Sequence, residues 1–335
     1  MPFGLSGYTR VETHSGQALV RCGSSRWISA IDGIIFDVDG VLIDVRESIQ
    51  LAHGIVAERY FGMLGWVNCT GMVTPEDVDN FKLARGFNSD WDLANAWVLL
   101  YLLKSTRYQS TDGAQLSGMP PTLADFASEV AERGGGLENA RKVLQELSSP
   151  EEWQKVLAWQ DRALLERIFK ETYSGDLCPE VYGFQASVPG PGLIWGDKCL
   201  LDRGRVPKDL KLGVATGRTL GETIVGLRLV GLSDLFPVSS CVTEDDGLWK
   251  PDPAVLRLAV DRTGCRYPMY VGDTPDDLAT VENYRSIGGD VVSCAVLTGL
   301  QGQDLEKLFA LQGADLIADN VNTALDVVAK IKGEM

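Results

Sequence analysis

Ile31-Asp-Gly-Ile-Ile-Phe-Asp-Val-Asp-Gly-Val-Leu-Ile-Asp44 is the stretch that decides how the rest of the chain folds. Its apolar run 34–36 is typical of a strand buried in a parallel sheet. Asp37 and Asp39 follow where this strand ends, and alternation along the chain directs both carboxylates to one side. Open parallel sheets bind ligands at the carboxyl ends of their strands, where one acid can attack and the other move a proton. Aspartates are also common where strands simply end. Whether this pair is catalytic therefore depends on the downstream segments.

Length and composition narrow the class of protein. The 335 residues suit two domains or one with a large insertion, and 45% hydrophobic with 23% charged residues is typical of globular proteins. No apolar run approaches the roughly 20 residues that span a bilayer, and no secretory signal is visible. We therefore expect a cytoplasmic protein without a membrane partner. The polar N-terminal extension, residues 1–30, is expected to be partly disordered.

Charge and reactive side chains exclude further classes. With 31 basic against 46 acidic residues and a net charge of −15, nucleic acid is not an expected partner. A small anionic substrate is still allowed, because one local positive pocket is enough to bind it. The seven cysteines form no CxxC pair and are expected to be reduced. His14 and His53 are the chain's two histidines, which argues against a histidine metal site or a Ser-His-Asp triad.

The order of strand and helix patterns predicts an α/β core interrupted by a helical insertion. Strand patterns lie at 33–38, 212–215, 241–242, 269–272, 291–297 and 315–318. Helical patterns follow at 220–230, 253–262, 275–285, 305–311 and 321–331. Such repeated βα units predict a parallel sheet flanked by helices. The middle of the chain shows helical patterns at 45–60, 76–84, 91–103, 122–133, 137–147 and 149–173. We therefore predict a core of 31–44 and 196–335, with an all-helical domain at 45–195.

Two later segments add groups that can bind an anion. Thr216 and Gly217 stand between a predicted strand and a predicted helix, where a hydroxyl, backbone amides and the helix dipole converge. The simpler alternative is that Thr216 caps the helix. Lys250 precedes the next helix, beside a proline that stiffens the backbone, although most lysines are solvated surface groups.

A third segment, Tyr270-Val-Gly-Asp-Thr-Pro-Asp-Asp277, again ends a strand in acids. On neighbouring strands, Asp37, Asp39 and Asp273 would crowd together. Two unit charges 4 Å apart repel by about 4 kcal/mol at an effective dielectric constant of about 20, which is large against a domain stability of about 5–15 kcal/mol. A cation offsets this repulsion, and ligands that are all oxygen select a hard ion such as Mg²⁺. Mg²⁺ beside Thr216 and Lys250 makes a pocket for a phosphoryl group.

In this order, the four segments resemble the motifs of the haloacid dehalogenase (HAD) superfamily. The matching stretches are Asp37-Val-Asp-Gly-Val41, Val214-Ala-Thr-Gly-Arg218, the lysine of Trp249-Lys-Pro-Asp-Pro253 and Gly272-Asp-Thr-Pro-Asp-Asp277. The resemblance covers residues 31–44 and 211–330. It implies a Rossmann-like parallel sheet with a helical cap of the C1 type inserted after the first motif, as in the phosphatase-like hydrolases of subfamily IA.

The resemblance also implies roles for the acids. Asp37 is the nucleophile that becomes an aspartyl-phosphate. Asp39 is the general acid for the leaving alcohol and then the base that activates water. Asp37, the backbone carbonyl of Asp39 and Asp273 hold Mg²⁺, while Asp277 supports them from nearby.

By the same resemblance, Thr216 and Gly217 bind the phosphoryl oxygens. Lys250 neutralises the charges of the nucleophile and of the phosphate. Asp39 also separates branches of the superfamily. The dehalogenases lack an acid two residues after the nucleophile, and the phosphonate hydrolases carry alanine there. Asp39 therefore favours phosphoryl transfer, in which a leaving oxygen must be protonated.

Substrate choice is expected to lie in the inserted domain, which is longer than a usual helical cap of this type. The segment 81–92 is the candidate because it mixes guanidinium, amide, acid and aromatic groups in a loop that could close over a site. Its candidate substrate contacts are Arg85, Asn88 and Trp91. The alternative is that Asn88 or Asp90 caps a helix and Trp91 is a core residue.

The expected function is that of a Mg²⁺-dependent phosphatase acting on a small phosphorylated metabolite. Two alternatives stay open. A phosphomutase would use the same residues to return the phosphoryl group to a sugar, and a non-catalytic protein could bind phospholigands on the same scaffold. The sequence does not indicate an oligomeric state.

Overall fold

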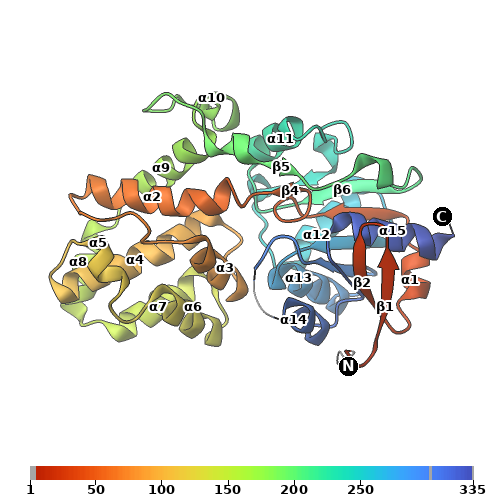
Figure 1. The fold of residues 1–335 in the computed structure, drawn as a ribbon, viewed down its shortest axis with the longest axis horizontal. Coiled ribbons are helices and arrows are strands. Elements are labelled where there is room, and N and C mark those ends of the chain that lie inside the picture. Colours follow the sequence, from red (N-terminus) through yellow and green to blue (C-terminus); the bar gives the residue numbers. More distant parts are fainter. Residues whose placement is uncertain (1–4, 302–303, 334–335) are drawn as a thin grey trace. The chain divides into compact units, whose positions relative to one another are not determined.

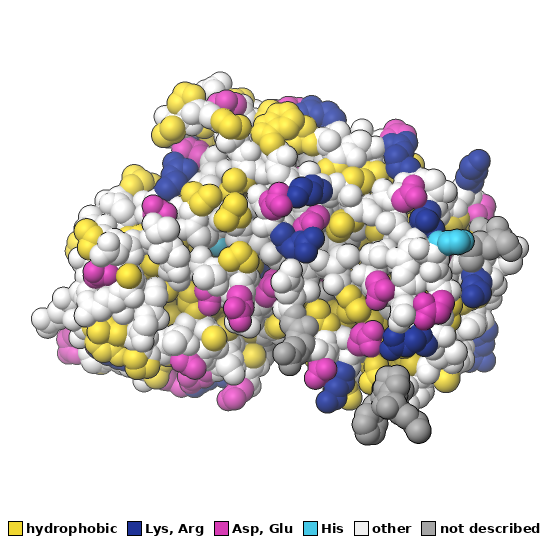
Figure 2. All heavy atoms as spheres, in the orientation of Figure 1, with side chains coloured by type: hydrophobic (Ala, Val, Ile, Leu, Met, Phe, Trp, Pro, Cys, Tyr) yellow, Lys and Arg dark blue, Asp and Glu magenta, His cyan; other side chains and the backbone are white. Residues whose placement is uncertain are grey.

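The computed structural model describes residues 5–301 and 304–333 (Figure 1). They fall into two compact units: unit 1, up to residue 45 and from 197 onward, and unit 2, residues 46–196. The sequence places the corresponding boundaries at 44/45 and 195/196. Among the described helices, none has both the length and the apolar composition that crossing a bilayer requires. On the face in Figure 2, basic side chains stand among acidic ones.

Unit 1 is built on one sheet with the strand order β1-β2-β10-β9-β8-β3-β6-β7. Its parallel strands are β3 (Gly33–Phe36), β6 (Lys211–Ala215), β7 (Cys241–Val242), β8 (Pro268–Gly272), β9 (Val292–Val296) and β10 (Leu316–Ala318). Every residue of β3, β8 and β9 is buried, as in a sheet covered on both faces. The predicted α/β fold with a Rossmann-like parallel sheet is confirmed.

Helices flank this sheet and connect its strands (Figure 1). They are α1 (Ser25–Ser29), α11 (Leu220–Leu229), α12 (Pro253–Thr263), α13 (Pro275–Ser286), α14 (Leu305–Leu311) and α15 (Val321–Lys332), with short 3-10 turns at η2 (Arg203–Arg205), η3 (Val238–Ser240) and η4 (Glu244–Asp246). Local signals set where the site helices begin. Thr219 and Thr274 open capping boxes on α11 and α13, and Asp252 caps α12 ahead of a proline.

The N-terminal extension was expected to be partly disordered, but residues 8–21 of it join the sheet. Residues 8–21 form an antiparallel hairpin of β1 (Tyr8–Thr13) and β2 (Gly16–Arg21), and β2 pairs antiparallel with β10. Its apolar triplet 18–20 is buried, which gives the hairpin a hydrophobic reason to stay on the sheet. Residues 1–4 of the extension lie outside the described residues.

The chain leaves and re-enters unit 1 through a pair of short strands. β4 (Ile43–Asp44) pairs antiparallel with β5 (Lys198–Cys199). A backbone hydrogen bond from Leu200 to Leu42 extends this pairing. The segments on either side of the insertion are therefore held together within unit 1.

Unit 2 is all-helical, as predicted from its sequence pattern. Its elements are α2 (Ile49–Met63), α3 (Pro75–Leu83), α4 (Asp90–Tyr108), α5 (Gly113–Ser117), α6 (Leu123–Glu132), α7 (Gly136–Leu147), α8 (Pro150–Trp159), α9 (Arg162–Ser174), α10 (Cys178–Val181) and η1 (Leu193–Gly196). Helix α4 packs on α5, α7, α8 and α9. Because α4 is buried on nearly every side, it is the centre of this unit's core.

The single helix expected over 149–173 is wrong. It is two helices, because Gln160 is extended and Asp161 caps α9 by accepting a hydrogen bond from the amide of Leu164 at 2.9 Å. The short helices α5 and α10 were not expected from the sequence.

Candidate active site

The strand order brings three predicted segments to one edge of the sheet. β3 lies between β6 and β8, with Phe36 in register with Val214 on one side and Val271 on the other. Asp37 directly follows β3, as Thr216 follows β6 and Asp273 follows β8. β3 is also where the strand order changes direction, the position at which open α/β sheets bind ligands.

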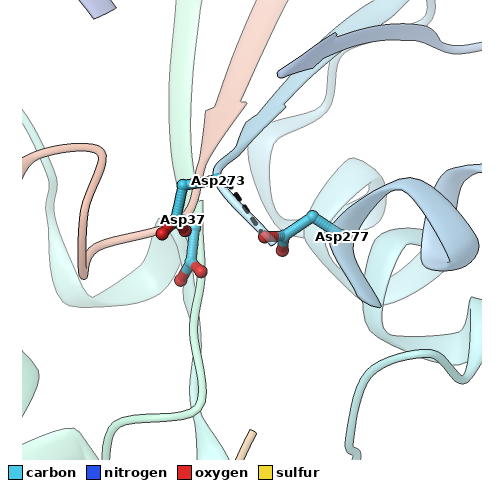
Figure 3. A group of neighbouring side chains, drawn as sticks. All are labelled: Asp37, Asp273 and Asp277. Carbon is cyan, nitrogen blue, oxygen red and sulfur yellow. Dashed lines mark hydrogen bonds between the residues drawn. The ribbon is translucent and has the colours of Figure 1, made fainter. Parts of the chain in front are cut away.

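Three carboxylates meet at this edge. Asp37, Asp273 and Asp277 are buried, and each offers an oxygen within 4.8 Å of the others. Figure 3 shows Asp37 and Asp273 side by side at the strand ends, with Asp277 approaching from the start of α13. The sequence argument grouped Asp39 with Asp37 and Asp273. In the structure, the third clustered carboxylate is Asp277, while Asp39 pairs with Arg218.

Two glycines allow the carboxylate of Asp273 to reach its position. A Cβ atom on either Gly40 or Gly299 would overlap Oδ2 of Asp273. Gly40 also has a φ of +70°, a conformation that favours glycine. The Thr298 hydroxyl donates to the carbonyl of Gly40 and ties this loop to the segment that follows β9. The sequence analysis did not identify the segment 298–299 as part of the site.

Lys250 lies inside the carboxylate cluster. Only 6% of this residue is exposed, and its Nζ atom lies 2.7 Å from Oδ2 of Asp37 and 2.7 Å from Oδ1 of Asp277. Burial by itself lowers the pKa of Lys250, but the charges of Asp277 and Asp37 outweigh it and hold that pKa well above its usual range. Lys250 is therefore a buried ammonium group at this site, not a solvated surface lysine.

Asp277 is saturated by donors of its own chain. Its Oδ1 accepts from Lys250 and from the Tyr270 hydroxyl, both at 2.7 Å. Its Oδ2 accepts from the amide of Asp273 at 3.1 Å and from the Thr274 hydroxyl at 2.7 Å. Burial raises the pKa of Asp277, but Lys250 and these hydrogen bonds bring it below its ordinary value. Asp277 thus fixes Lys250 and the backbone of Asp273.

Asp37 has the opposite shift. Burial raises its pKa to about 6; Lys250 opposes this, and the charge of Asp277 adds to it. Its Oδ1 accepts a hydrogen bond from the amide of Val38 at 2.7 Å, and its Oδ2 contacts Lys250. The two acids that share Lys250 therefore have pKa values shifted in opposite directions. Asp37, whose pKa is raised, accepts fewer hydrogen bonds than Asp277.

Thr216 is buried at the end of β6, and its hydroxyl accepts a hydrogen bond from the amide of Arg218 at 3.2 Å. The alternative that Thr216 caps the helix is wrong, because the cap is Thr219. The expected contribution of the first helical amides is also corrected. The amides of Thr219, Leu220 and Glu222 are already bound by side chains of this chain. Gly217 is half-buried in the loop that precedes the helix, and binding of phosphoryl oxygens by Thr216 and Gly217 stays a prediction.

Arg218 and Asp197 were not identified as site residues from the sequence. Arg218 is 3% exposed, and its guanidinium reaches Oδ1 of Asp39 through Nε at 2.8 Å and through Nη2 at 2.7 Å. Nη2 also lies 3.2 Å from Oδ2 of Asp197, whose side chain is fully buried. Arg218 stood inside a matched motif, but nothing in the spacing pointed to a partner 179 residues away.

The candidate substrate residues of unit 2 have different environments. Trp91 is 9% exposed and packs edge-on against Phe169, with ring centroids 4.9 Å apart, as the core alternative expects. Ser89 occupies the N-cap position of helix α4, without a capping hydrogen bond from its side chain, so neither Asn88 nor Asp90 holds that position. Arg85 is exposed and has a φ of +70°, and Asn88 is half-buried. Substrate contact by Arg85 or Asn88 stays a prediction.

One family model matches most of the chain. The family model described as haloacid dehalogenase-like hydrolase matches residues 31–283. The solved structure of phosphatase Tt82 from Thermococcus thioreducens is 30% identical, with a TM-score of 0.52, over 84% of this chain and 99% of that one. A structural-genomics target with a TM-score of 0.59 is 19% identical, over 91% of this chain and all of the other, and shows the fold alone.

A curated relative has a different name. The imidazoleglycerol-phosphate dehydratase of Phytophthora nicotianae is 26% identical over 255 residues, which are 75% of this chain. The aligned part is 41% of the relative, so this chain spans less than half of that protein's length.

Proposed function

We propose that this chain, which belongs to the haloacid dehalogenase-like hydrolases, is a phosphatase that hydrolyses a small phosphomonoester through Asp37. The family membership confirms the resemblance read from the four motifs. The observation that carries the proposal is the contact between Asp37 and the buried Lys250 at the carboxyl edge of the sheet, beside Thr216 and Asp273. An ionised acid, an ammonium group and a hydroxyl together suit attack on a phosphoryl group.

The residues divide the work as follows. Asp37 attacks phosphorus and becomes an aspartyl-phosphate, and Lys250 offsets the charge of the nucleophile and of the incoming phosphate. Thr216 and Gly217 bind phosphoryl oxygens. Asp39 protonates the leaving oxygen and afterwards takes a proton from the water that hydrolyses the intermediate.

A hard divalent cation fits the donor set. Three buried carboxylates lie together, two of them in contact with the ammonium group of Lys250, and the clustered acids offer only oxygen ligands. Asp37, Asp273 and the backbone carbonyl of Asp39 would hold Mg²⁺, with Asp277 behind them because its oxygens already serve other donors. When bound, the ion neutralises charge that develops on the phosphoryl oxygens.

The decisive experiment measures phosphate release by the full chain from p-nitrophenyl phosphate and from a panel of phosphorylated sugars, polyols and amino alcohols. Imidazoleglycerol phosphate belongs in this panel because the curated relative's name contains it. We expect release with Mg²⁺, loss of release with EDTA, and a fall of about 10⁴-fold or more in Asp37→Asn.

Asp234→Asn is the matched control, since Asp234 is an exposed acid of unit 1 that pairs with Arg203. It should retain wild-type activity. Activity that survives in Asp37→Asn would contradict the proposal. Isomerisation of a sugar phosphate without net phosphate release would show that the chain is a mutase and not a phosphatase.

A further inference from the structure

The guanidinium of Arg218 is the centre of a buried charged cluster in unit 1 that the roles above leave unused. It is held between two carboxylates, Asp39 on one side and Asp197 on the other. The side chains of Arg218 and Asp197 are 2% and 0% exposed, whereas that of Asp39 is 20% exposed. The cluster therefore runs from the interior, at Asp197, to the one member that solvent reaches, which is Asp39.

The contacts to Asp39 are asymmetric. Nε and Nη2 of Arg218 both approach Oδ1 of Asp39, at 2.8 and 2.7 Å. An oxygen that accepts a hydrogen bond from Nε and also lies against the positively charged Nη2 is poorly suited to carry a proton, because a proton there would face both donors. This leaves Oδ2 as the oxygen of Asp39 that can carry one.

The fold makes room for this arrangement. Gly226 lies inside helix α11, where glycine costs about 1 kcal/mol relative to alanine. A Cβ atom at this position would lie 2.5 Å from Nη1 of Arg218. Arg218 cannot easily give way, because it is buried and fixed by two acids. A glycine at position 226 therefore leaves the space that the guanidinium of Arg218 occupies beside helix α11.

We propose that Arg218, fixed by Asp197, is a positioning residue that holds Asp39 by Oδ1 and so presents Oδ2 to the leaving oxygen. The inference rests on the proposed phosphatase function and adds the group that orients its general acid. In the first step, an oxygen of Asp37 bonds to phosphorus and the bond from phosphorus to the leaving oxygen breaks. The leaving oxygen keeps that electron pair and takes the proton from Oδ2, so Asp39 ends ionised beside Arg218.

This role predicts a dependence on the leaving group. p-Nitrophenolate is stable as an anion and departs without a proton, whereas an alkoxide needs one. A misplaced general acid therefore slows alkyl phosphates far more than p-nitrophenyl phosphate. A residue that only stabilises the fold, or only binds phosphate, slows both substrates equally.

The test compares kcat/KM for p-nitrophenyl phosphate and for a simple alkyl phosphate in the full chain with Mg²⁺. In Arg218→Met we expect the alkyl substrate to lose about 10²-fold or more and p-nitrophenyl phosphate to lose less than about tenfold. Arg218→Lys keeps the charge without the fork of donors and should recover only part of the ratio. Asp39→Asn gives the reference ratio for an absent general acid.

Gly226→Ala displaces the guanidinium without removing it, and should shift the ratio in the same direction by about tenfold. Gly62→Ala is its control, because Gly62 is also helical and a Cβ atom there meets no other atom within 4 Å. This control should leave the ratio unchanged.

The ratio is measured within one preparation, so a partly unfolded variant lowers both rates equally and leaves it intact. Equal losses on the two substrates in Arg218→Met would overturn the inference, and so would an unchanged ratio in Gly226→Ala. Failure of the proposed function itself looks different: the wild-type chain would then release no phosphate from either substrate.

Discussion

The two units bury charged side chains in opposite ways. In unit 1, three carboxylates are buried together, two of them, Asp37 and Asp277, contact the ammonium group of Lys250, and the pKa of Asp37 is raised to about 6.

In unit 2, a buried polar chain is internally balanced. His53 is fully buried; its Nδ1 accepts a hydrogen bond from Trp97 at 3.3 Å, and its Nε2 lies 3.2 Å from Oδ1 of Asp90. Asp90 also lies 3.6 Å from Nζ of Lys82. Burial lowers the pKa of His53, with Asp90 opposing that shift, so the imidazole remains neutral between a donor and an acceptor.

The difference separates two uses of buried polar groups. A chain such as the one through His53 satisfies itself and orders a helical core. The cluster around Lys250 holds three acids close together at a sheet edge, where a bound cation would offset their mutual repulsion. Lys82 and Tyr101 of unit 2 are counterparts of Lys250 and Tyr270 in unit 1, so substitutions at these four positions test the contrast.

Lys250→Met should have the largest effect. Removing the ammonium group leaves Asp37 and Asp277 buried without their counter-charge, which should cost about 3–5 kcal/mol in the free energy of unfolding and about 10²–10³-fold in kcat. Lys82→Met leaves Asp90 with its hydrogen bond to His53, and the two side chains of this pair are 15% and 16% exposed, so the cost should be smaller, about 1–2 kcal/mol. Denaturant unfolding and phosphate release measure both. Equal losses of stability in the two variants would contradict the claim that the two units bury their charged side chains differently.

Mg²⁺ should raise the melting temperature more at pH 7.5 than at about pH 5. The folded-state pKa of Asp37 is raised to about 6, so its contribution to stability is present below the unfolded pKa near 4 and is lost as pH rises through about 6. Mg²⁺ binds the ionised acid, and at low pH it must first displace a proton.

Thermal unfolding with Mg²⁺ or EDTA at both pH values checks this dependence. Asp37→Asn should show a smaller Mg²⁺ effect that changes little with pH. A Mg²⁺ effect in the wild-type chain that is as large at about pH 5 as at pH 7.5 would contradict the assignment.

Tyr270→Phe should have the smallest effect. It removes the hydroxyl that donates to Oδ1 of Asp277, at a cost of about 1–2 kcal/mol in stability and up to about tenfold in kcat through the loosened Lys250. Tyr101→Phe removes a buried hydroxyl of unit 2 that donates to the carbonyl of Met72 at 2.5 Å. It should cost similar stability and leave activity unchanged. If kcat fell as much in Tyr101→Phe as in Tyr270→Phe, the role of the Tyr270 hydroxyl in holding Asp277 and Lys250 would be contradicted.

The centre of unit 1 could be predicted because its signals are local. Asp37, Thr216 and Asp273 each directly follow a short strand, and parallel strands present their carboxyl ends at one edge. Asp37, Thr216 and Asp273 therefore follow three adjacent strands at one edge of the sheet. Lys250 needed the family resemblance, since a lysine ahead of a helix has no distinguishing spacing.

The contacts between distant segments could not be predicted. The pair of Arg218 and Asp39 joins residues 179 apart, and no pattern in either segment specifies it. The hairpin at 8–21 was missed because its polar residues, on an exposed edge strand, resemble a disordered tail. Its apolar triplet 18–20 was the available signal. Asp161 likewise marked the start of α9, as a helix-capping residue inside an otherwise continuous helical pattern.

The most direct measurement of the central claim is to trap the covalent intermediate. The full chain is mixed with Mg²⁺ and a phosphomonoester that it hydrolyses, quenched in acid and digested, and the peptides are sequenced by mass spectrometry. The account predicts one phosphoryl group on the side chain of Asp37, absent in Asp37→Asn. A phosphoryl group on another residue, or turnover that continues in Asp37→Asn, would contradict it.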